Sequence, residues 1–235
     1  MTRVYLLDVE GTTSPVSLVS EQLFPYARRH MEAFLRGHDR KVVVQADLAM
    51  LYEENQMEAD SAAPRIEDAA SVAQAMAYLL WLMERDRKST ALKSLQGKVW
   101  KDGYESRELI GSVFPDVPEA LARWSAKAKV AIYSSGSVEA QKLIFGHSSA
   151  GDLTPLISGY FDTRVGPKTS AESYSAIAGA MGVATGEMLF ISDVVRELNP
   201  AREAGCETRL ALREGNAPVA DAEGHVAIRS FAEIP

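Results

Sequence analysis

The chain has a single cysteine, no long apolar run and no excess of basic residues, and each shortage excludes a class of protein. Cys206 has no second cysteine with which to form an internal disulfide, a redox pair or a structural zinc site. The longest apolar stretch, 76–83 (MAYLLWLM), is far shorter than a membrane span, and the opening MTRVYLLDVEG lacks the apolar length of a signal peptide. We therefore expect a cytoplasmic protein without a membrane partner.

The charge balance is acidic, with a formal net charge of −7 and a pI near 5.2. A general nucleic-acid binder needs a basic face to displace counterions from phosphates, so we expect no nucleic-acid partner. A small anionic ligand remains compatible with this charge, because a few local cations are enough to hold one. The 235 residues, 46% of them hydrophobic, can bury a substantial core, and we expect a monomer.

The spacing of apolar residues changes twice along the chain. Val4–Leu7 is a short apolar strand, and apolar residues then recur at helical spacing from Ser17 to about Met83. The stretch 98–104 (KVWKDGY) is expected to be a loop. Beyond Pro118, short apolar strands alternate with amphipathic helices: helices at 119–127, 138–145, 171–181 and 201–204, and strands at 130–133, 160–161, 188–191 and 208–211. The last helix is expected to begin at or just after Pro200, with Asn199 before it.

This alternation is typical of a parallel sheet covered by helices on both faces. We predict an α/β fold: a doubly wound core formed by residues 1–16 and 113–235, with an all-helical cap formed by residues 17–112 and inserted after the first strand. The cap is expected to close over the site, exclude water and carry substrate selectivity.

Polar residues follow the predicted strands, at the edge of the sheet where ligands bind in open parallel sheets. They are Asp8, Glu10 and Thr12 after the first strand, Ser134, Ser135 and Gly136 after the second, Asp193 after 188–191, and Lys168 in the loop VGPKTSAES. Each has an unremarkable interpretation as a solvated loop, a turn, a helix cap or a surface lysine. Their occurrence together at one edge of the sheet favours a catalytic site.

These residue types suit phosphoryl transfer. A carboxylate such as Asp8 can attack phosphorus and form an aspartyl phosphate, which divides one difficult displacement into two easier ones. Carboxylate oxygens from Asp8 and Asp193 suit one Mg²⁺ per subunit. Hydroxyl and backbone N–H groups of the serine turn can hold phosphate oxygens, and Lys168 can neutralise charge on the transferring group. Glu10 can serve as general acid and then as general base.

Four segments resemble the motifs of the haloacid-dehalogenase-like phosphohydrolases, and more narrowly those of the enolase-phosphatases of methionine salvage: LLDVEGTTS, IYSSGSVEAQKLIFGHSSAGDL, FDTRVGPKTSAESY and LFISDVVRELNPAREAG. The narrower resemblance depends on Glu10, where an aspartate is usual in the superfamily, and on the long segment that follows Tyr133. It also includes GKVWKDGYES in the insertion and covers nearly the whole chain.

The resemblance implies roles for individual residues. Asp8 would be the nucleophile, Asp8, Glu10 and Asp193 the Mg²⁺ ligands, and Ser134, Ser135 and Lys168 the phosphate-binding residues, with Thr12 also near the substrate. The implied substrate is 2,3-diketo-5-methylthiopentyl 1-phosphate, which would be enolised and dephosphorylated to the acireductone 1,2-dihydroxy-3-keto-5-methylthiopentene. Lys98, Trp100 and Tyr104 are candidates to line the cap, although ordinary packing of a helix explains them equally well.

Four alternatives remain. Another capped phosphatase of the superfamily, acting on a small phosphate ester or a phosphonate, would keep the same core motifs. A dehalogenase would need neither a metal nor an acid at position 10. A signalling receiver also stores phosphate on an aspartate beside Mg²⁺, serine or threonine, and lysine, but a receiver domain is about half this length. A non-catalytic binding module with a relic site would have lost one of the motif residues, and none is lost.

Overall fold

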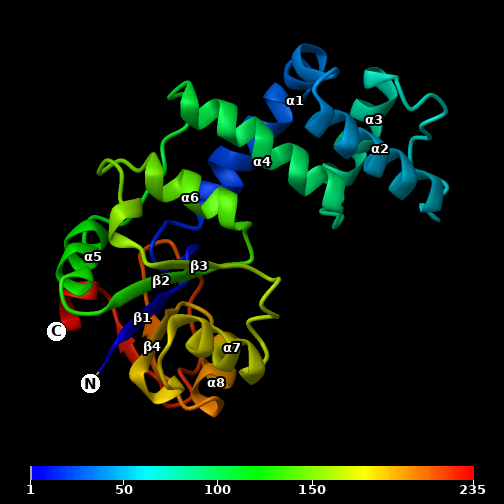
Figure 1. Cartoon of the computed structure of the whole chain (residues 1–235). Helices are drawn as coiled ribbons and strands as arrows, with labels where there is room; N and C mark the ends of the chain where they lie inside the picture. The colour runs from blue at the N-terminus through cyan, green and yellow to red at the C-terminus, as the bar shows by residue number, and fades with distance from the viewer. Residues whose placement is uncertain (1) are drawn as a thin grey trace. The chain divides into compact units, whose positions relative to one another are not determined.

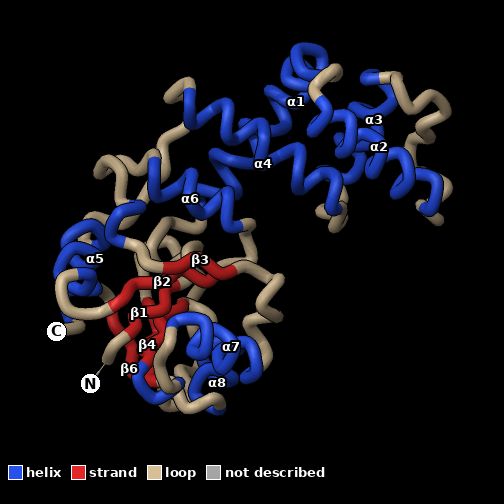
Figure 2. The backbone as a smooth tube through the Cα atoms, in the orientation of Figure 1, coloured by secondary structure: helices blue, strands red, loops and turns tan. Residues whose placement is uncertain are grey.

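The computed structural model of the chain describes residues 2–235 and divides them into two compact units. The sheet unit comprises the residues up to Val19 together with Leu109–Pro235, and the helical unit comprises Ser20–Glu108. Figure 2 shows all the strands in the sheet unit. Throughout residues 2–235, none of the helices combines the length and apolar character that crossing a bilayer requires.

The sheet unit is built on six parallel strands in the order β3-β2-β1-β4-β5-β6 (Figure 1). The strands are β1 (Val4–Leu7), β2 (Lys129–Tyr133), β3 (Gly159–Phe161), β4 (Met188–Ser192), β5 (Glu207–Ala211) and β6 (Val226–Ile228). β1 lies in the middle, where Leu7 pairs with Ile132 on one side and with Ile191 on the other. This arrangement confirms the predicted doubly wound parallel sheet.

One face of the sheet is covered by α7 (Ala171–Met181) and α8 (Val195–Glu203) (Figure 1). Alternate strand residues such as Leu6 and Phe190 are fully buried there against Tyr174 and Leu198. The rings of Tyr174 and Phe190 lie 5.1 Å apart. Because successive strand residues point to opposite faces, the remaining residues of the same strands must be covered by other helices.

The opposite face packs against α5 (Val117–Ser125), with α6 (Val138–Gly146) beside β3. Trp124 of α5 is fully buried and stacks on Tyr5 of β1, with ring centroids 4.3 Å apart. Phe231, in the short helix η4 (Phe231–Glu233), completes this layer 5.1 Å from Trp124. Burial on both faces explains why the strands are continuous apolar runs rather than alternating ones.

The helical unit is entered through η1, a π-helical segment over Leu18–Leu23, and contains four α-helices. They are α1 (Phe24–His38), α2 (Val42–Met57), α3 (Val72–Glu84) and α4 (Thr90–Glu105). Pro25 stands in the first turn of α1, where a missing backbone N–H is tolerated. The hydroxyls of Ser71 and Ser89 accept hydrogen bonds from backbone N–H groups and so cap α3 and α4. Fully buried residues such as Leu51 and Leu95 form the core of the helical unit.

The prediction of a loop over 98–104 is wrong, because all of these residues lie in α4. Two glycines, Gly97 and Gly103, lower the intrinsic helix propensity of the segment. Both glycines are buried, and α4 packs against α1 and α2. Tertiary packing therefore overrides the weak local preference.

The expected start of the last helix at Pro200 is also wrong. α8 begins at Val195, and Pro200 lies within it. The chain reverses direction immediately after β4, where the hydroxyl of Ser192 accepts a hydrogen bond from the N–H of Val194 at 3.1 Å. The helix can therefore begin at the next residue, five positions before Pro200. A further difference is β6, which the apolar pattern does not reveal because it has only three residues and Val226 is 59% exposed.

Candidate active site

The turn after β1 holds Asp8 at the carboxyl edge of the sheet. Asp8 is 5% exposed, and its backbone N–H donates to the carbonyl oxygen of Ile191 at 3.0 Å. The Thr13 hydroxyl donates to the Asp8 carbonyl oxygen at 2.9 Å, which closes the turn. Gly11 adopts a φ of +66°, and a Cβ there would overlap Oδ2 of Asp193. Glycine is therefore required by both the backbone conformation and the proximity of that carboxylate.

Lys168 reaches Asp8 from the loop between β3 and α7. Its ammonium contacts Oδ1 of Asp8 and lies 3.0 Å from Oε2 of Glu197, with only 11% of the side chain exposed. Burial alone would lower the pKa of Lys168, but the carboxylates of Asp8 and Glu197 outweigh burial and hold the pKa above its ordinary value. The Tyr174 hydroxyl lies 2.8 Å from the carbonyl oxygens of both Lys168 and Glu197 and so connects their backbones. Lys168 is thus fixed as a cation.

Glu10 and Asp193 occupy the same acidic surroundings as Asp8. Burial raises the pKa of Glu10, and the neighbouring Asp8 carboxylate raises it further. Burial followed by the charge of Asp8 raises the pKa of Asp193 to about 7. Both carboxyl groups are therefore close enough to Asp8 to repel its charge, as residues that share one site do.

Glu197 belongs to this cluster and is not among the residues predicted from the sequence. It lies in the first turn of α8, and its Oε2 accepts a hydrogen bond from the Ser192 hydroxyl at 3.0 Å. Burial and then Asp8 raise the pKa of Glu197, while Lys168 opposes them. Asp193 precedes α8, so its spacing from Glu197 is not that of a helical pair, and no local pattern of the sequence identifies Glu197.

The serine turn follows β2 as predicted. Ser134 is buried, and its hydroxyl accepts a hydrogen bond from the Gly136 N–H at 3.1 Å, whereas Ser135 is exposed. Ser137 caps the start of α6 by accepting a hydrogen bond from the N–H of Ala140 at 3.2 Å. The turn thus presents polar groups at a helix N-terminus, the geometry that favours anions.

Thr12 is fully buried, and its hydroxyl hydrogen-bonds no other residue between positions 2 and 235. Its carbonyl oxygen accepts a 3.0 Å hydrogen bond from Nε of Arg213, in the loop after β5. In the same loop Asn216 donates from Nδ2 to the Gly11 carbonyl oxygen at 2.8 Å. These two side chains hold the turn that carries Asp8, a role that the sequence pattern did not indicate. That Thr12 contacts substrate stays a prediction.

Lys98 and Trp100 lie in α4 and have partners within the helical unit. The Lys98 ammonium lies 2.6 Å from Oδ2 of Asp47 and 2.8 Å from the Ser94 hydroxyl. Nε1 of Trp100 donates to the carbonyl oxygen of Leu23 at 2.8 Å. Tyr104 is almost fully buried in the same helix. Their predicted contact with a substrate stays a prediction.

The acidic residues at the sheet edge fit a divalent cation by their chemistry. Asp8, Glu10 and Asp193 supply hard oxygen donors, which Mg²⁺ prefers. The charge of Asp8 raises the pKa of each of the other two acids, so the group has an excess of negative charge that a cation would relieve. Across residues 2–235, no three His, Cys, Asp or Glu side chains already converge as a ready-made metal cluster.

Comparison with known proteins gives consistent similarities. The model of the haloacid dehalogenase-like hydrolases matches residues 2–205. Proteins named Enolase-phosphatase E1 from Synechococcus elongatus and Pseudomonas aeruginosa are 50% and 49% identical, over 97% and 99% of this chain and 96% and 97% of their own lengths. The crystal structure of the UTR4 protein from Saccharomyces cerevisiae superposes with a TM-score of 0.82 at 37% identity, covering 98% of this chain and 99% of that one.

Proposed function

Because this chain belongs to the enolase-phosphatase E1 family of haloacid dehalogenase-like hydrolases, we propose that it converts 2,3-diketo-5-methylthiopentyl 1-phosphate into the acireductone 1,2-dihydroxy-3-keto-5-methylthiopentene and phosphate, as a step of methionine salvage. The observation that carries the proposal is the contact between the Lys168 ammonium and Oδ1 of Asp8, at the sheet edge where Glu10 and Asp193 also lie.

The first step is enolisation, in which Glu10 takes a proton from carbon 1 of the substrate and the oxygen at carbon 2 takes a proton from solvent and becomes a hydroxyl. Glu10, two residues beyond Asp8, is our candidate base for this step. The same residue would have to serve later as an acid. We assign it the proton transfers because its pKa is raised by burial and by Asp8, and its carboxyl group belongs to the acidic cluster.

In the second step an Asp8 carboxylate oxygen attacks phosphorus, and the bond from phosphorus to the oxygen on carbon 1 breaks. The enediol oxygen leaves with a proton from Glu10, and Asp8 carries the phosphoryl group as an acyl phosphate. Water then attacks phosphorus and gives a proton to Glu10, and the bond from the Asp8 oxygen to phosphorus breaks to release phosphate. Glu10 passes its proton to solvent, so both carboxylates are regenerated. Lys168 lies where it would neutralise charge on the transferring oxygens, and the turn of Ser134 and Ser135 would bind them.

We propose one Mg²⁺ per chain, held by Asp8, Glu10 and Asp193. When bound, the ion supplies charge neutralisation between the nucleophilic carboxylate and the phosphate, together with stabilisation of an enolate. The helical unit is proposed to act as a cap that selects the substrate, and Lys98 and Trp100 remain candidates for that role. We also propose that the protein acts in the cytoplasm as a monomer.

The test is to incubate the protein with Mg²⁺ and the diketo phosphate and to follow enediol absorbance and released phosphate together. The proposal predicts that both signals rise and that the Asp8→Asn variant gives neither. If phosphate is released only from other small phosphate esters or from phosphonates, the proposed substrate is wrong and a related capped phosphatase is the better description. If no ester is hydrolysed, the enzymatic proposal fails.

A further inference from the structure

Gln141 is a buried glutamine of α6, the helix that follows the serine turn formed by residues 134–136. It is 1% exposed, and its Nε2 donates to two backbone carbonyl oxygens, that of Gly136 at 2.9 Å and that of Phe161 at 2.8 Å. Gly136 belongs to the serine turn, and Phe161 is the last residue of β3. One side chain thus joins the turn after β2 to the end of the neighbouring strand.

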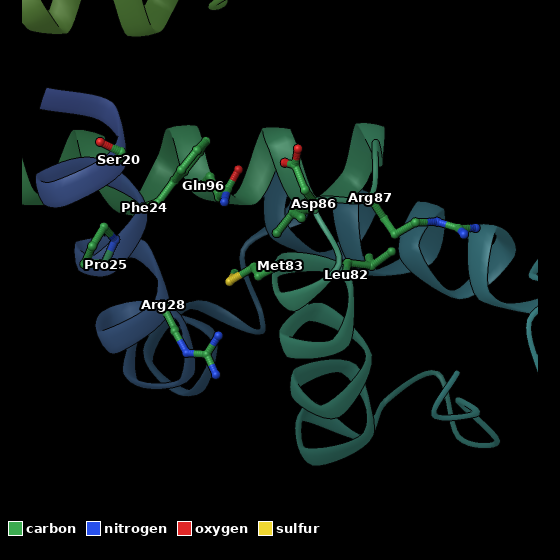
Figure 3. Close-up of a pocket in the computed structure, with 10 residues that line it drawn as sticks. Ser20, Phe24, Pro25, Arg28, Leu82, Met83, Asp86, Arg87 and Gln96 are labelled. Carbon is green, nitrogen blue, oxygen red and sulfur yellow. The ribbon is translucent and has the colours of Figure 1, made fainter. Parts of the chain in front are cut away.

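The bonding of this amide differs from that of Gln96, a buried glutamine of the helical unit. Gln96 lines a pocket of that unit among side chains of mixed character, such as Leu82 and Arg28 (Figure 3). The two N–H groups of Gln141 instead donate to backbone, while its Oε1 is buried and accepts no hydrogen bond within residues 2–235. A buried carbonyl oxygen without a partner is destabilising. The contribution of Gln141 therefore lies in the two hydrogen bonds that it donates.

The hydrogen bond to Gly136 also determines where Ser134 is held. The Gly136 N–H donates to the Ser134 hydroxyl oxygen at 3.1 Å. The Ser134 N–H donates at 3.1 Å to the Phe161 carbonyl oxygen, which is the same oxygen that Gln141 binds. Because glycine has the most permissive backbone, Gly136 needs an anchor to keep its N–H directed at Ser134. Gln141 supplies that anchor.

The Ser134 hydroxyl is left with a hydrogen to donate. A hydroxyl group has one hydrogen and two acceptor lone pairs, and here its oxygen accepts from the Gly136 N–H. Among the described residues, no other group accepts the Ser134 hydrogen, although the side chain is only 6% exposed. A phosphate oxygen would accept it in a charge-assisted hydrogen bond.

The start of α6 has anchors of its own, so removal of Gln141 should leave the helix in place. Oδ2 of Asp162 accepts a hydrogen bond from the Val138 N–H at 3.3 Å, and the Ser137 hydroxyl accepts one from the Ala140 N–H at 3.2 Å. The loss of the Gln141 amide should therefore affect the serine turn more than the fold.

We propose that Gln141 is a positioning residue for phosphate binding: by holding the Gly136 carbonyl oxygen, it keeps the Ser134 hydroxyl in place as a donor to a phosphate oxygen. The inference rests on the proposed function, because it takes the serine turn as the phosphate site. It adds to that function a residue that acts through Gly136 and Ser134 without touching the substrate.

The test measures the Kd of inorganic phosphate in the presence of Mg²⁺ by calorimetry, for the unsubstituted full-length protein and for Gln141→Met. Methionine is similar in length and has no N–H to donate. We expect phosphate affinity to fall about three- to tenfold, the effect of one hydrogen bond. The Kd of Mn²⁺, a probe of the acidic residues measured without phosphate, should stay unchanged, whereas a general loosening of the site would weaken both ligands.

A double-substitution cycle separates action through Ser134 from a merely structural effect. In the Ser134→Ala background, Gln141→Met should weaken phosphate binding by less than about twofold, because the hydroxyl that it positions is absent. The matched control is Thr208→Val, which removes a buried 2.7 Å hydrogen bond to His225 near the start of β5 and should leave the phosphate Kd unchanged. If Gln141→Met does not fold, Gln141→Asn tests the same point, because its amide is one methylene shorter.

Three results would overturn the inference: no phosphate binding by the unsubstituted protein, a phosphate Kd that does not depend on Gln141, or equal effects of Gln141→Met with and without the Ser134 hydroxyl. A parallel loss of Mn²⁺ affinity would do the same.

Turnover of the diketo phosphate, measured separately, distinguishes this inference from the proposed function. Normal turnover with a phosphate Kd that is independent of Gln141 refutes the positioning role and leaves the proposed function standing. Phosphate binding with the expected dependence on Gln141, but without turnover, supports the positioning role and refutes the proposed substrate.

Discussion

The Arg213→Met substitution tests how the turn that carries the nucleophile is held. The Arg213 guanidinium donates to the Thr12 carbonyl oxygen at 3.0 Å and lies 2.8 Å from Oδ2 of Asp116. It is also stacked between the rings of Phe114 and Phe231, 4.7 and 4.4 Å from their centroids. One side chain thus connects the loop after β5 to the turn after β1 and to the start of α5.

The magnitude follows from burial of the ion pair. The side chains of Arg213 and Asp116 are 5% and 20% exposed. Removing one partner of such a pair destabilises a protein by about 3–5 kcal/mol. Asp116 keeps hydrogen bonds from the Ser230 hydroxyl and the Phe231 N–H, and methionine retains part of the apolar contact with the rings. We therefore expect a loss near the lower limit, about 3 kcal/mol.

The assay is a urea titration in which unfolding is monitored by hydrogen exchange of peptides from β1 and β5. The measured free energy of unfolding is then that of the sheet unit. The matched control is Arg3→Met, also in the sheet unit, whose ion pair with Glu187 is exposed and should contribute about 0.5 kcal/mol or less. A loss in Arg213→Met no larger than that of the control would refute the reasoning.

The acid dependence gives a second readout of the same ion pair. Burial tends to raise the pKa of Asp116, but hydrogen bonds from Arg213 and the Phe231 N–H outweigh burial and hold it below the ordinary value of 3.8. Its contribution to stability is therefore present above pH 3.8 and is lost as the pH falls through the lower folded-state pKa. In Arg213→Met the loss of stability at acid pH should be smaller than in the unsubstituted protein. If the free energy of unfolding falls equally with pH in both proteins, the ion pair between Arg213 and Asp116 is contradicted.

Three further predictions concern other positions. Gly11→Ala should abolish phosphatase activity and destabilise the protein by more than about 1 kcal/mol, because a Cβ there overlaps Asp193 and φ is +66°. Glu197→Gln should lower kcat about ten- to a hundredfold, because it removes one of the two carboxylates that position Lys168. His225 is buried, and burial followed by the charge of Arg202 lowers its pKa, so its contribution to stability in urea titrations should be lost as the pH falls below about 6.5.

Each of these predictions has a control. Gly215→Ala has the same positive sign of φ but no atom within 4 Å of the new Cβ, so it should be milder than Gly11→Ala. For Glu197→Gln the control is Glu203→Gln, which changes an exposed carboxylate of the same helix and should leave kcat unchanged. If the two variants have the same kcat, the role of Glu197 in positioning Lys168 is refuted. For His225, replacement by Gln should flatten the stability profile near pH 6.5, and an unchanged profile would contradict the assignment.

The parallel sheet could be predicted because its strands are buried on both faces. Val4–Leu7 and Met188–Ser192 are continuous apolar runs that end in polar residues, so both their existence and the site at their ends are visible locally. β6 could not be predicted, because a three-residue edge strand with an exposed Val226 leaves no apolar pattern. The helical structure of 98–104 was missed because Gly103 and the preceding Gly97 disfavour a helix, and packing of α4 against α1 and α2 stabilises it.

The residues that directly follow the strands could be predicted as one site, because the carboxyl ends of parallel strands lie at the same edge of the sheet. Asp8 and Lys168 are 160 positions apart, yet both follow sheet strands, and they are in contact. Glu197 was missed because its role depends on where Lys168 points, which no local pattern encodes. Arg213 and Asn216 were missed for the same reason, since both act through backbone carbonyl oxygens of a distant turn.

The central claim is that Asp8 accepts the phosphoryl group, and trapping the covalent intermediate tests it most directly. The enzyme would be mixed with Mg²⁺ and the diketo phosphate, quenched in acid during turnover, reduced with borohydride and mapped by mass spectrometry. We predict that the peptide containing Asp8 carries homoserine at position 8, and that Asp8→Asn shows no such product. Turnover accompanied by a modified residue elsewhere, or by none, would contradict the account.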